Sequence, residues 1–220
     1  MFFKLETSSD APFPDPALAE TNPNGLLAVG GDLTIPRLLN AYKKGIFPWY
    51  SEGDPILWWS PNPRLILKPQ DLHISRSLQK LIRQQKFDIT INQCFEQVIN
   101  ACAQPAKERE TTWITDEIKQ AYIDFHKAGF ALSFEIWFEK KLVGGLYGVC
   151  IGQAFFGESM FSLMSNTSKL ALVTLVEYAL KHNIQLIDCQ MTTPHLLSMG
   201  AKEMSRACFL KELKNKVSFV

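Results

Sequence analysis

Residues 184–191 read Ile-Gln-Leu-Ile-Asp-Cys-Gln-Met, and this stretch decides what kind of sheet the chain builds. Its large and β-branched apolar residues predict a short strand, and Pro194 marks where regular pairing stops. Side chains alternate across a strand, so Asp188 and Gln190 are expected on one face at its C-terminal end. Ligands of α/β sheets gather at that end, and a carboxylate on an apolar face needs a partner or a task. A purely structural alternative stays open, in which Asp188 caps a loop and Gln190 forms hydrogen bonds with buried backbone groups.

The composition is that of an ordinary globular chain. The 220 residues are 46% apolar and 20% charged, enough to bury a sizeable core, and the best division is one large domain with a smaller one. A net charge of +1 means that a nucleic-acid partner would have to meet a local basic patch. The five cysteines form no CxxC pair, and residues 1–5 show no signal-peptide pattern, so reduced thiols and a cytoplasmic location are expected. No apolar run approaches a membrane span, and no His/Cys spacing indicates a metal site.

Three strand-like stretches precede this strand, at residues 130–138, 141–150 and 153–161. The short turns between them predict an antiparallel meander. A strongly apolar helix over residues 168–182 then leads to the strand that carries Asp188. Three antiparallel strands, a helix and a strand with polar groups are typical of an α+β acyltransferase-like sheet.

A second carboxylate stands inside an apolar run, Phe-Phe-Gly-Glu-Ser-Met-Phe at residues 155–161. A carboxylate in such surroundings is a candidate functional group for the same reason as Asp188. Glu158 therefore joins Asp188 and Gln190 as a residue expected to carry chemistry.

Two features are compatible with contact to a nucleic acid. Three of the five tryptophans, among them Trp49, lie within eleven positions between prolines, where aromatic rings serve either as core plugs or as stacking platforms for bases. A helix over residues 75–87 places Arg76, Lys80 and Arg83 on one stripe and its leucines opposite. A solvated charged face explains that stripe equally well.

Several motifs, in order and in register, resemble one known family. They are NPNGLLAVGGDL, GIFPWYSEGDPILWWSPNPR, TTWIT, LVGGLYGV, FFGESMFS and LIDCQ. Together they are similar to leucyl/phenylalanyl-tRNA protein transferases from about residue 22 to about residue 213. The resemblance implies a small N-terminal α/β domain over residues 1–64 and a C-terminal catalytic domain with a GNAT-like acyltransferase sheet over residues 65–220.

The resemblance also implies an activity and its partners. The family transfers Leu, Phe or Met from aminoacyl-tRNA to the N-terminal Arg or Lys of an acceptor protein, which marks that protein for degradation. No ATP, metal or coenzyme A is implied, and the expected protein is a monomer. Two positions depart from the family pattern, since Thr193 replaces an Asn and Met199 replaces a usual Leu.

Site residues are carried over by position. Asp188 and Gln190 would activate the attacking amine, and Glu158 would bind the cationic acceptor. Five residues would contact the tRNA, namely Trp49, Trp113, Arg76, Lys80 and Arg83. An apolar pocket for the transferred amino acid is expected among Leu146, Phe155, Leu172, Leu175, Ala179 and Ile187.

Two other functions stay open. A non-catalytic RNA-binding module would explain the basic helix and the aromatic residues, but it would leave Asp188 and Glu158 without a task. An N-acyltransferase that uses an acyl-CoA such as acetyl-CoA would share the sheet, but no Gly-rich pyrophosphate loop opens the helix near Ser168.

Overall fold

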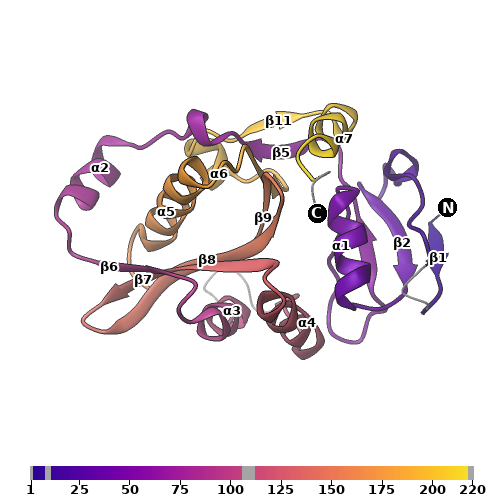
Figure 1. The fold of residues 1–220 in the computed structure, drawn as a ribbon, viewed down its shortest axis with the longest axis horizontal. Coiled ribbons are helices and arrows are strands. Elements are labelled where there is room, and N and C mark those ends of the chain that lie inside the picture. The colour runs from indigo at the N-terminus through magenta and orange to yellow at the C-terminus, as the bar shows by residue number, and fades with distance from the viewer. Residues whose placement is uncertain (1, 8–10, 106–111, 218–220) are drawn as a thin grey trace.

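The computed structural model describes residues 2–7, 11–105 and 112–217, and this part of the chain contains two sheets (Figure 1). The smaller sheet has the strand order β1-β2-β4-β3. Its elements are β1 (Phe3–Leu5), η1 (Pro16–Leu18), β2 (Leu26–Gly30), α1 (Ile35–Lys43), β3 (Phe47–Pro48) and β4 (Leu57–Trp59). Trp58 is fully buried and donates its indole N–H to the carbonyl of Gly30 at 2.8 Å, so this tryptophan is a core plug.

The larger sheet has seven strands in the order β11-β5-β10-β9-β8-β7-β6. Its strands are β5 (Arg64–Leu67), β6 (Asp88–Ile91), β7 (Ala131–Phe138), β8 (Lys141–Ile151), β9 (Ala154–Ser162), β10 (Leu186–Gln190) and β11 (Lys202–Met204). Neighbouring strands run antiparallel except β9 and β10, which run parallel. The helices that accompany it are η2 (Pro69–Asp71), α2 (Arg76–Arg83), α3 (Phe95–Ala103), α4 (Asp116–Lys127), α5 (Thr167–Lys181), α6 (Pro194–Ser198) and α7 (Arg206–Lys214).

The predicted meander is confirmed as β7, β8 and β9, and each strand begins and ends within one residue of its expected position. The helix expected over residues 168–182 is α5, and the strand at 184–191 is β10. Glu139 and Lys140 form the first turn in the left-handed region, with φ of 49° and 62°. Local periodicity and turn composition were sufficient here because each stretch is long or strongly apolar.

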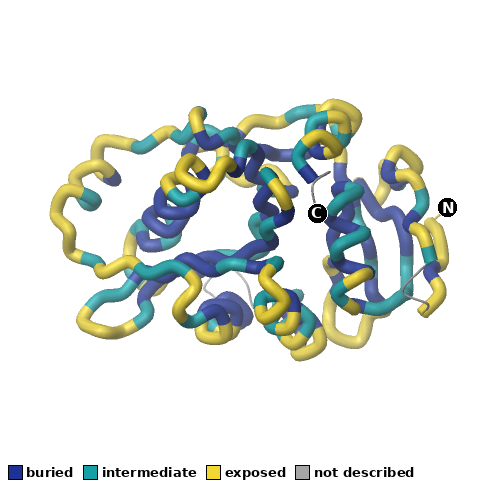
Figure 2. The backbone as a smooth tube through the Cα atoms, in the orientation of Figure 1, coloured by how far each residue is buried: buried dark blue, intermediate teal, exposed yellow. Residues whose placement is uncertain are grey.

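Helices cover both faces of the larger sheet. In Figure 1, α5 lies on one face, and α3 and α4 lie on the other. Successive side chains of β9 serve these two layers, since Phe155 belongs to the core under α5 and Phe156 to the core that includes α3 and α4. Figure 2 shows the result, with buried backbone along the central strands and along the inward side of α5.

One continuous apolar cluster passes between the two sheets. It includes Leu27 and Trp58 of the smaller sheet together with Ile118 of α4 and Phe209 of α7. The smaller sheet ends at Trp59 and β5 begins at Arg64. A domain boundary at residue 64 stays a prediction, because a shared core stabilises both parts together.

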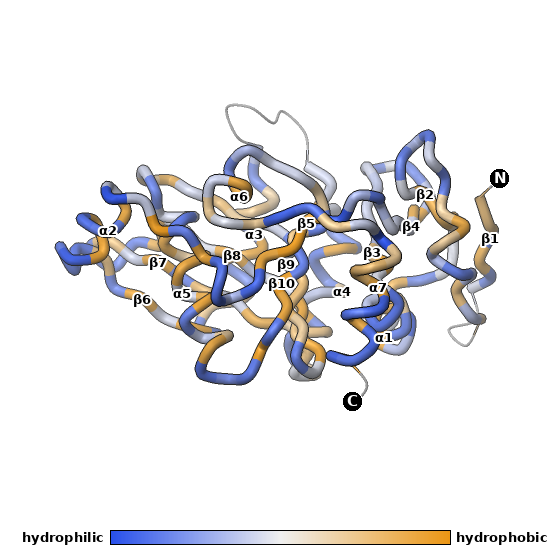
Figure 3. The backbone as a smooth tube through the Cα atoms, turned by 90° about the horizontal axis from the view of Figure 1, so that it is seen from above, coloured by the Kyte–Doolittle hydropathy of each residue, from blue (hydrophilic) through white to orange (hydrophobic). Residues whose placement is uncertain are grey.

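Helix α2 lies at the end of the long axis opposite to β1 in both Figure 1 and Figure 3. Ser75 caps it by accepting a hydrogen bond from the backbone N–H of Leu78 at 3.3 Å. Leu78 is the buried residue of this helix, and it packs in the core under α5. Within the described residues, no helix combines the length and apolarity needed to span a membrane.

Candidate active site

Two β-bulges aim Glu158 and Gln190 at each other where β9 and β10 stop pairing. The two strands are in register up to Phe156 and Asp188, and they pair no further. The register of β8 with β9 skips Glu158, and the register of β5 with β10 skips Cys189. Gln190 adopts a φ of 63°, and its side-chain amide donates to Oε1 of Glu158 at 3.0 Å. A bulge re-aims a side chain, so two of them convert the end of a parallel pair into a polar contact.

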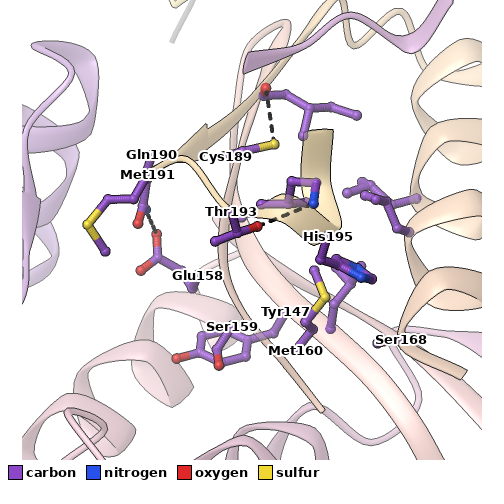
Figure 4. A pocket seen from close by; sticks show the side chains of 16 residues that line it. Tyr147, Glu158, Ser159, Met160, Ser168, Cys189, Gln190, Met191, Thr193 and His195 are labelled. Atoms are coloured by element: carbon purple, nitrogen blue, oxygen red, sulfur yellow. Dashed lines mark hydrogen bonds between the residues drawn. The ribbon is translucent and has the colours of Figure 1, made fainter. Parts of the chain in front are cut away.

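A cavity of about 460 Å³ opens beside this contact (Figure 4). Four of the residues expected in an amino-acid pocket line it, namely Leu146, Leu172, Leu175 and Ile187. Sulfur and aliphatic side chains complete an apolar wall, with Met160, Cys189, Met191 and Leu196. A cavity of this size with apolar walls and a few convergent polar groups is the usual form of a small-molecule site.

Two residues expected in the pocket do not line this cavity, and the prediction for them is wrong. Phe155 is fully buried in the core under α5, where its ring meets Phe134 edge to face at 6.0 Å between centroids. Ala179 is also fully buried in that core. Sequence periodicity identified both as inward-facing, but it does not distinguish a side chain packed against neighbours from one that faces a cavity.

Asp188 lies outside the cavity, which corrects the expectation that it shares one face with Gln190. The guanidinium of Arg64 donates to both carboxylate oxygens of Asp188, from Nε at 2.8 Å and from a terminal nitrogen at 2.6 Å. Both side chains are buried. Oδ1 of Asp188 also accepts the backbone N–H of Gln190 at 2.9 Å. The bulge at Cys189 changes the alternation, so the carboxylate fixes the backbone of Gln190 from behind.

The Arg64 guanidinium is held from three further sides. It donates to the carbonyl of Gly45 at 3.1 Å, and its Cζ lies 4.9 Å from the ring of Phe47 and 4.6 Å from the ring of Phe209. A buried charge pair is stable only when its remaining donors are satisfied, and aromatic faces favour a guanidinium. The arrangement explains why an isolated Asp can be fully buried in this sheet.

Glu158 is partly exposed to the cavity and collects hydroxyl donors from two helices. Tyr42 of α1 donates to Oε1 at 2.7 Å, and Tyr122 of α4 donates to Oε2 at 3.0 Å. The two phenol oxygens also lie in close contact with each other. Burial raises the pKa of Glu158 to about 7, and the nearby Asp188 charge raises it further, while the hydrogen bonds from Tyr42, Tyr122 and Gln190 lower it.

A second pocket, of about 400 Å³, brings together two aromatic residues that were expected to act together. Trp49 and Trp113 both line it, beside Trp59 and Tyr50. Trp49 is 37% exposed, and its ring meets that of Trp59 at 66° with centroids 5.5 Å apart. Thr111, the first residue of the TTWIT motif, lies outside the described residues.

Helix α4 connects the two pockets. Its Glu117 accepts a hydrogen bond from Tyr50 of the aromatic pocket at 2.9 Å, and its Tyr122 contacts Glu158 at the apolar cavity. Five residues of helix rise by about 7.5 Å. Helix α4 therefore contacts a residue of each pocket.

The basic stripe of α2, formed by Arg76, Lys80 and Arg83, is exposed and lines neither pocket. The structure describes no ion pair for these three residues. Helix α2, which carries the stripe, lies at the end of the long axis away from β1 (Figure 1).

The two departures from the family pattern are accommodated locally. Thr193 accepts the backbone N–H of Leu196 at 3.2 Å through its hydroxyl and so caps α6, a task that Asn also performs. Met199 is 2% exposed and packs in the core under α5, where Leu and Met are nearly equal in volume.

Several residues of the site had no signal in the sequence. Tyr42, Arg64 and Tyr122 reach the site from 116, 124 and 36 positions away along the chain. A usable signal existed for Met191 and Leu196, because they follow the C-terminal end of β10, where ligands gather in such sheets. Among the described residues, no group of three or more His, Cys, Asp or Glu side chains is placed to hold a metal ion.

The fold has solved counterparts. FemX matches with a TM-score of 0.50 at 10% identity, covering 78% of this chain and 66% of that chain. A GCN5-related N-acetyltransferase from Kribbella flavida matches at a TM-score of 0.42 and 13% identity, covering 74% and 58%. The expected α+β class is confirmed, with a sheet like that of FemX and a separate N-terminal region.

Sequence comparisons narrow this class. The profile of the leucyl/phenylalanyl-tRNA protein transferase family matches residues 66–214, and the profile of the N-terminal domain of these transferases matches residues 31–62. The leucyl/phenylalanyl-tRNA protein transferase of Desulfatibacillum aliphaticivorans is 55% identical over 208 residues, which is 94% of this chain and 88% of that protein. The one of Pseudomonas fluorescens (strain Pf0-1) is 54% identical over 197 residues, which is 90% and 87%. The chain belongs to the leucyl/phenylalanyl-tRNA protein transferase family.

Proposed function

We propose that the protein moves Leu, Phe or Met from aminoacyl-tRNA to the N-terminal Arg or Lys of an acceptor protein, forms a peptide bond and so marks the acceptor for degradation. The observation that carries this proposal is an apolar cavity of about 460 Å³ that ends at the Glu158–Gln190 contact, in a chain of this family. The aminoacyl ester is already activated, so the enzyme has to position an amine and move protons.

The apolar cavity would hold the side chain of the transferred amino acid. Its walls are formed by Leu146, Met160, Leu172, Leu175 and Ile187, which come from three strands and α5. Such walls discriminate by about 1–3 kcal/mol per methylene, so Leu, Phe and Met are all accepted and polar side chains are not. Methionine and leucine side chains in the wall also adapt to differently shaped occupants.

The aromatic pocket would hold the terminal adenosine of the tRNA. Trp49 and Trp113 offer ring faces, and stacking of a base is worth roughly 1–3 kcal/mol. The exposed basic stripe of α2 would contact phosphates of the acceptor stem, since the enzyme has to accept tRNAs of different sequence. Phosphate contacts position the RNA without reading its bases.

The polar pair would meet the acceptor protein. Glu158 presents a carboxylate to the cavity and would bind the cationic N-terminus of the acceptor or its Arg or Lys side chain, because a carboxylate pairs well with an ammonium or guanidinium. Gln190 would orient the attacking nitrogen, and Asp188 would act through Gln190 by fixing its backbone. A monomer in the cytoplasm is part of the same proposal, and the five free cysteines support the reducing location.

One assay tests the proposal. Purified protein is mixed with radiolabelled Leu-tRNA and two peptides that differ only in an N-terminal Arg or Ala. Transfer of label to the Arg peptide alone is the expected result. Binding of the tRNA without transfer to either peptide would instead indicate an RNA-binding module, and labelling from acetyl-CoA in place of Leu-tRNA would indicate an acyl-CoA enzyme.

A further inference from the structure

We propose that Glu158 takes the proton of the attacking amine and returns it to the ribose oxygen that leaves. This inference rests on the proposed aminoacyl transfer, and it gives Glu158 a catalytic role in addition to binding the acceptor. It assigns to Asp188 a positioning role only.

The carboxylate of Glu158 has one acceptor position left for a substrate. Its Oε1 accepts from Tyr42 at 2.7 Å and from Gln190 at 3.0 Å, and its Oε2 accepts from Tyr122 at 3.0 Å. An ionised carboxylate offers about four lone-pair sites. The three protein donors fix its orientation and leave one acceptor position on Oε2, which the inference gives to an N–H of a substrate in the cavity that Glu158 lines.

The other titratable groups near the cavity suit this task less well. Arg64 occupies both oxygens of Asp188, which does not line the cavity. Burial raises the pKa of the Cys189 thiol, so it stays neutral and accepts no proton. His195 lines the cavity, and burial together with Lys169 lowers its pKa, but it makes no contact with Gln190 among the hydrogen bonds of the described residues.

The protonation state of Glu158 matches the role. Its pKa of about 7 leaves both forms populated near neutral pH, which is where a general base is most effective. The titratable groups that face it are Tyr42 of α1, Tyr122 of α4 and Asp188 of β10. Burial raises the pKa of both tyrosines, so both phenols remain neutral donors.

The step is balanced without a co-reactant. The neutral α-amine of the acceptor attacks the ester carbonyl, a C–N bond forms, and the carbonyl π pair moves to its oxygen. One N–H proton passes to Oε2 of Glu158. The C–O bond to the ribose then breaks, the carbonyl reforms, and Glu158 returns the same proton to the leaving oxygen. Glu158 ends the cycle ionised, as it began.

Kinetics of Glu158→Gln distinguish this role from binding alone. With saturating Leu-tRNA and varied Arg peptide, the inference predicts a fall in kcat of about 100-fold to 10,000-fold. It also predicts that kcat of the unaltered enzyme rises with pH near pH 7 and that this rise is lost in the variant. A higher KM with kcat retained would overturn it. Glu177→Gln, an exposed change on α5, is the matched control and should leave both constants unchanged.

A second variant identifies which group titrates, since the acceptor amine itself titrates at about 7.7–8.0. Tyr122→Phe removes a donor that stabilises the anion, so it should move the acid limb of kcat/KM to higher pH. An unmoved limb would overturn the inference, as would a limb that disappears in His195→Gln. Melting temperatures confirm that each variant is folded. Absence of transfer by the unaltered enzyme would instead refute the proposed function.

Discussion

Replacing Arg64 by Met tests the ion pair behind the active site. The guanidinium is fully buried, binds both oxygens of Asp188, and lies between the rings of Phe47 and Phe209. Methionine has a similar unbranched stem and an apolar end, so it can occupy the same aromatic slot. The substitution leaves Asp188 in the core with the backbone N–H of Gln190 as its remaining partner in the structure.

The expected loss of unfolding free energy is about 3–5 kcal/mol, because an uncompensated charge then remains buried. For a chain of this length, each kcal/mol corresponds to roughly 2–4 °C, so the melting temperature should fall on the order of 10 °C. Transfer activity should fall as well, since the Gln190 bulge depends on Asp188.

Urea titration at several pH values measures the effect. In the variant, burial without a cation favours the neutral carboxylic acid of Asp188 over the carboxylate. The deficit should therefore be smallest at acidic pH, where the carboxyl group is protonated, and should grow as the pH rises and the buried carboxylate forms. The double variant Arg64→Met with Asp188→Asn buries no charge, keeps an oxygen for Gln190, and should recover part of the stability.

Two results would refute this reasoning. One is a loss below about 1 kcal/mol for Arg64→Met, which would mean that the pair is not desolvated as the structure has it. The other is a double variant no more stable than Arg64→Met alone.

Four further outcomes follow from the site. Leu172→Trp reduces the volume of the apolar cavity and should suppress transfer of Phe more than transfer of Met, because the Met side chain is narrower and more flexible. Equal losses for Phe and Met would mean that the side chain of the transferred amino acid binds outside this cavity. Replacing the three residues of the basic stripe by Ala should raise the KM for Leu-tRNA and flatten its salt dependence, yet spare an aminoacyl-adenosine substrate; equal impairment of both would make the stripe structural. Trp113→Ala should impair both substrates, since both contain the terminal nucleoside. Glu158→Gln should raise the unfolding free energy at pH 8 by up to about 3 kcal/mol, reduced by the solvent screening that comes with the partial exposure of Glu158 to the cavity. Below about pH 4.5 the substitution should change the unfolding free energy little, because the folded pKa of Glu158 is raised and its charge is costly only at higher pH. An equal gain at both pH values would contradict this.

Elements that depend on the local spacing of apolar residues could be predicted from the sequence. The meander β7–β8–β9, helix α5 and strand β10 could be predicted within one or two residues, since each depends on the spacing of its own apolar residues. Gln190, Glu158 and four residues of the cavity wall could be identified for the same reason. Trp49 and Trp113 were expected to hold the terminal adenosine together, and local spacing does not show that both line one pocket.

What the sequence by itself determined is therefore the elements, their order and most of the polar residues at the end of β10. The tertiary structure alone decided which way those residues point. A bulge adds one residue to a strand and reverses its alternation, so Asp188 meets Arg64 and Gln190 meets Glu158. The tyrosines that hold Glu158 come from α1 and α4, and only the packing of both helices on one core brings them to it. Alternation is a property of neighbours along the chain, whereas a cavity and a buried ion pair depend on residues a hundred positions apart.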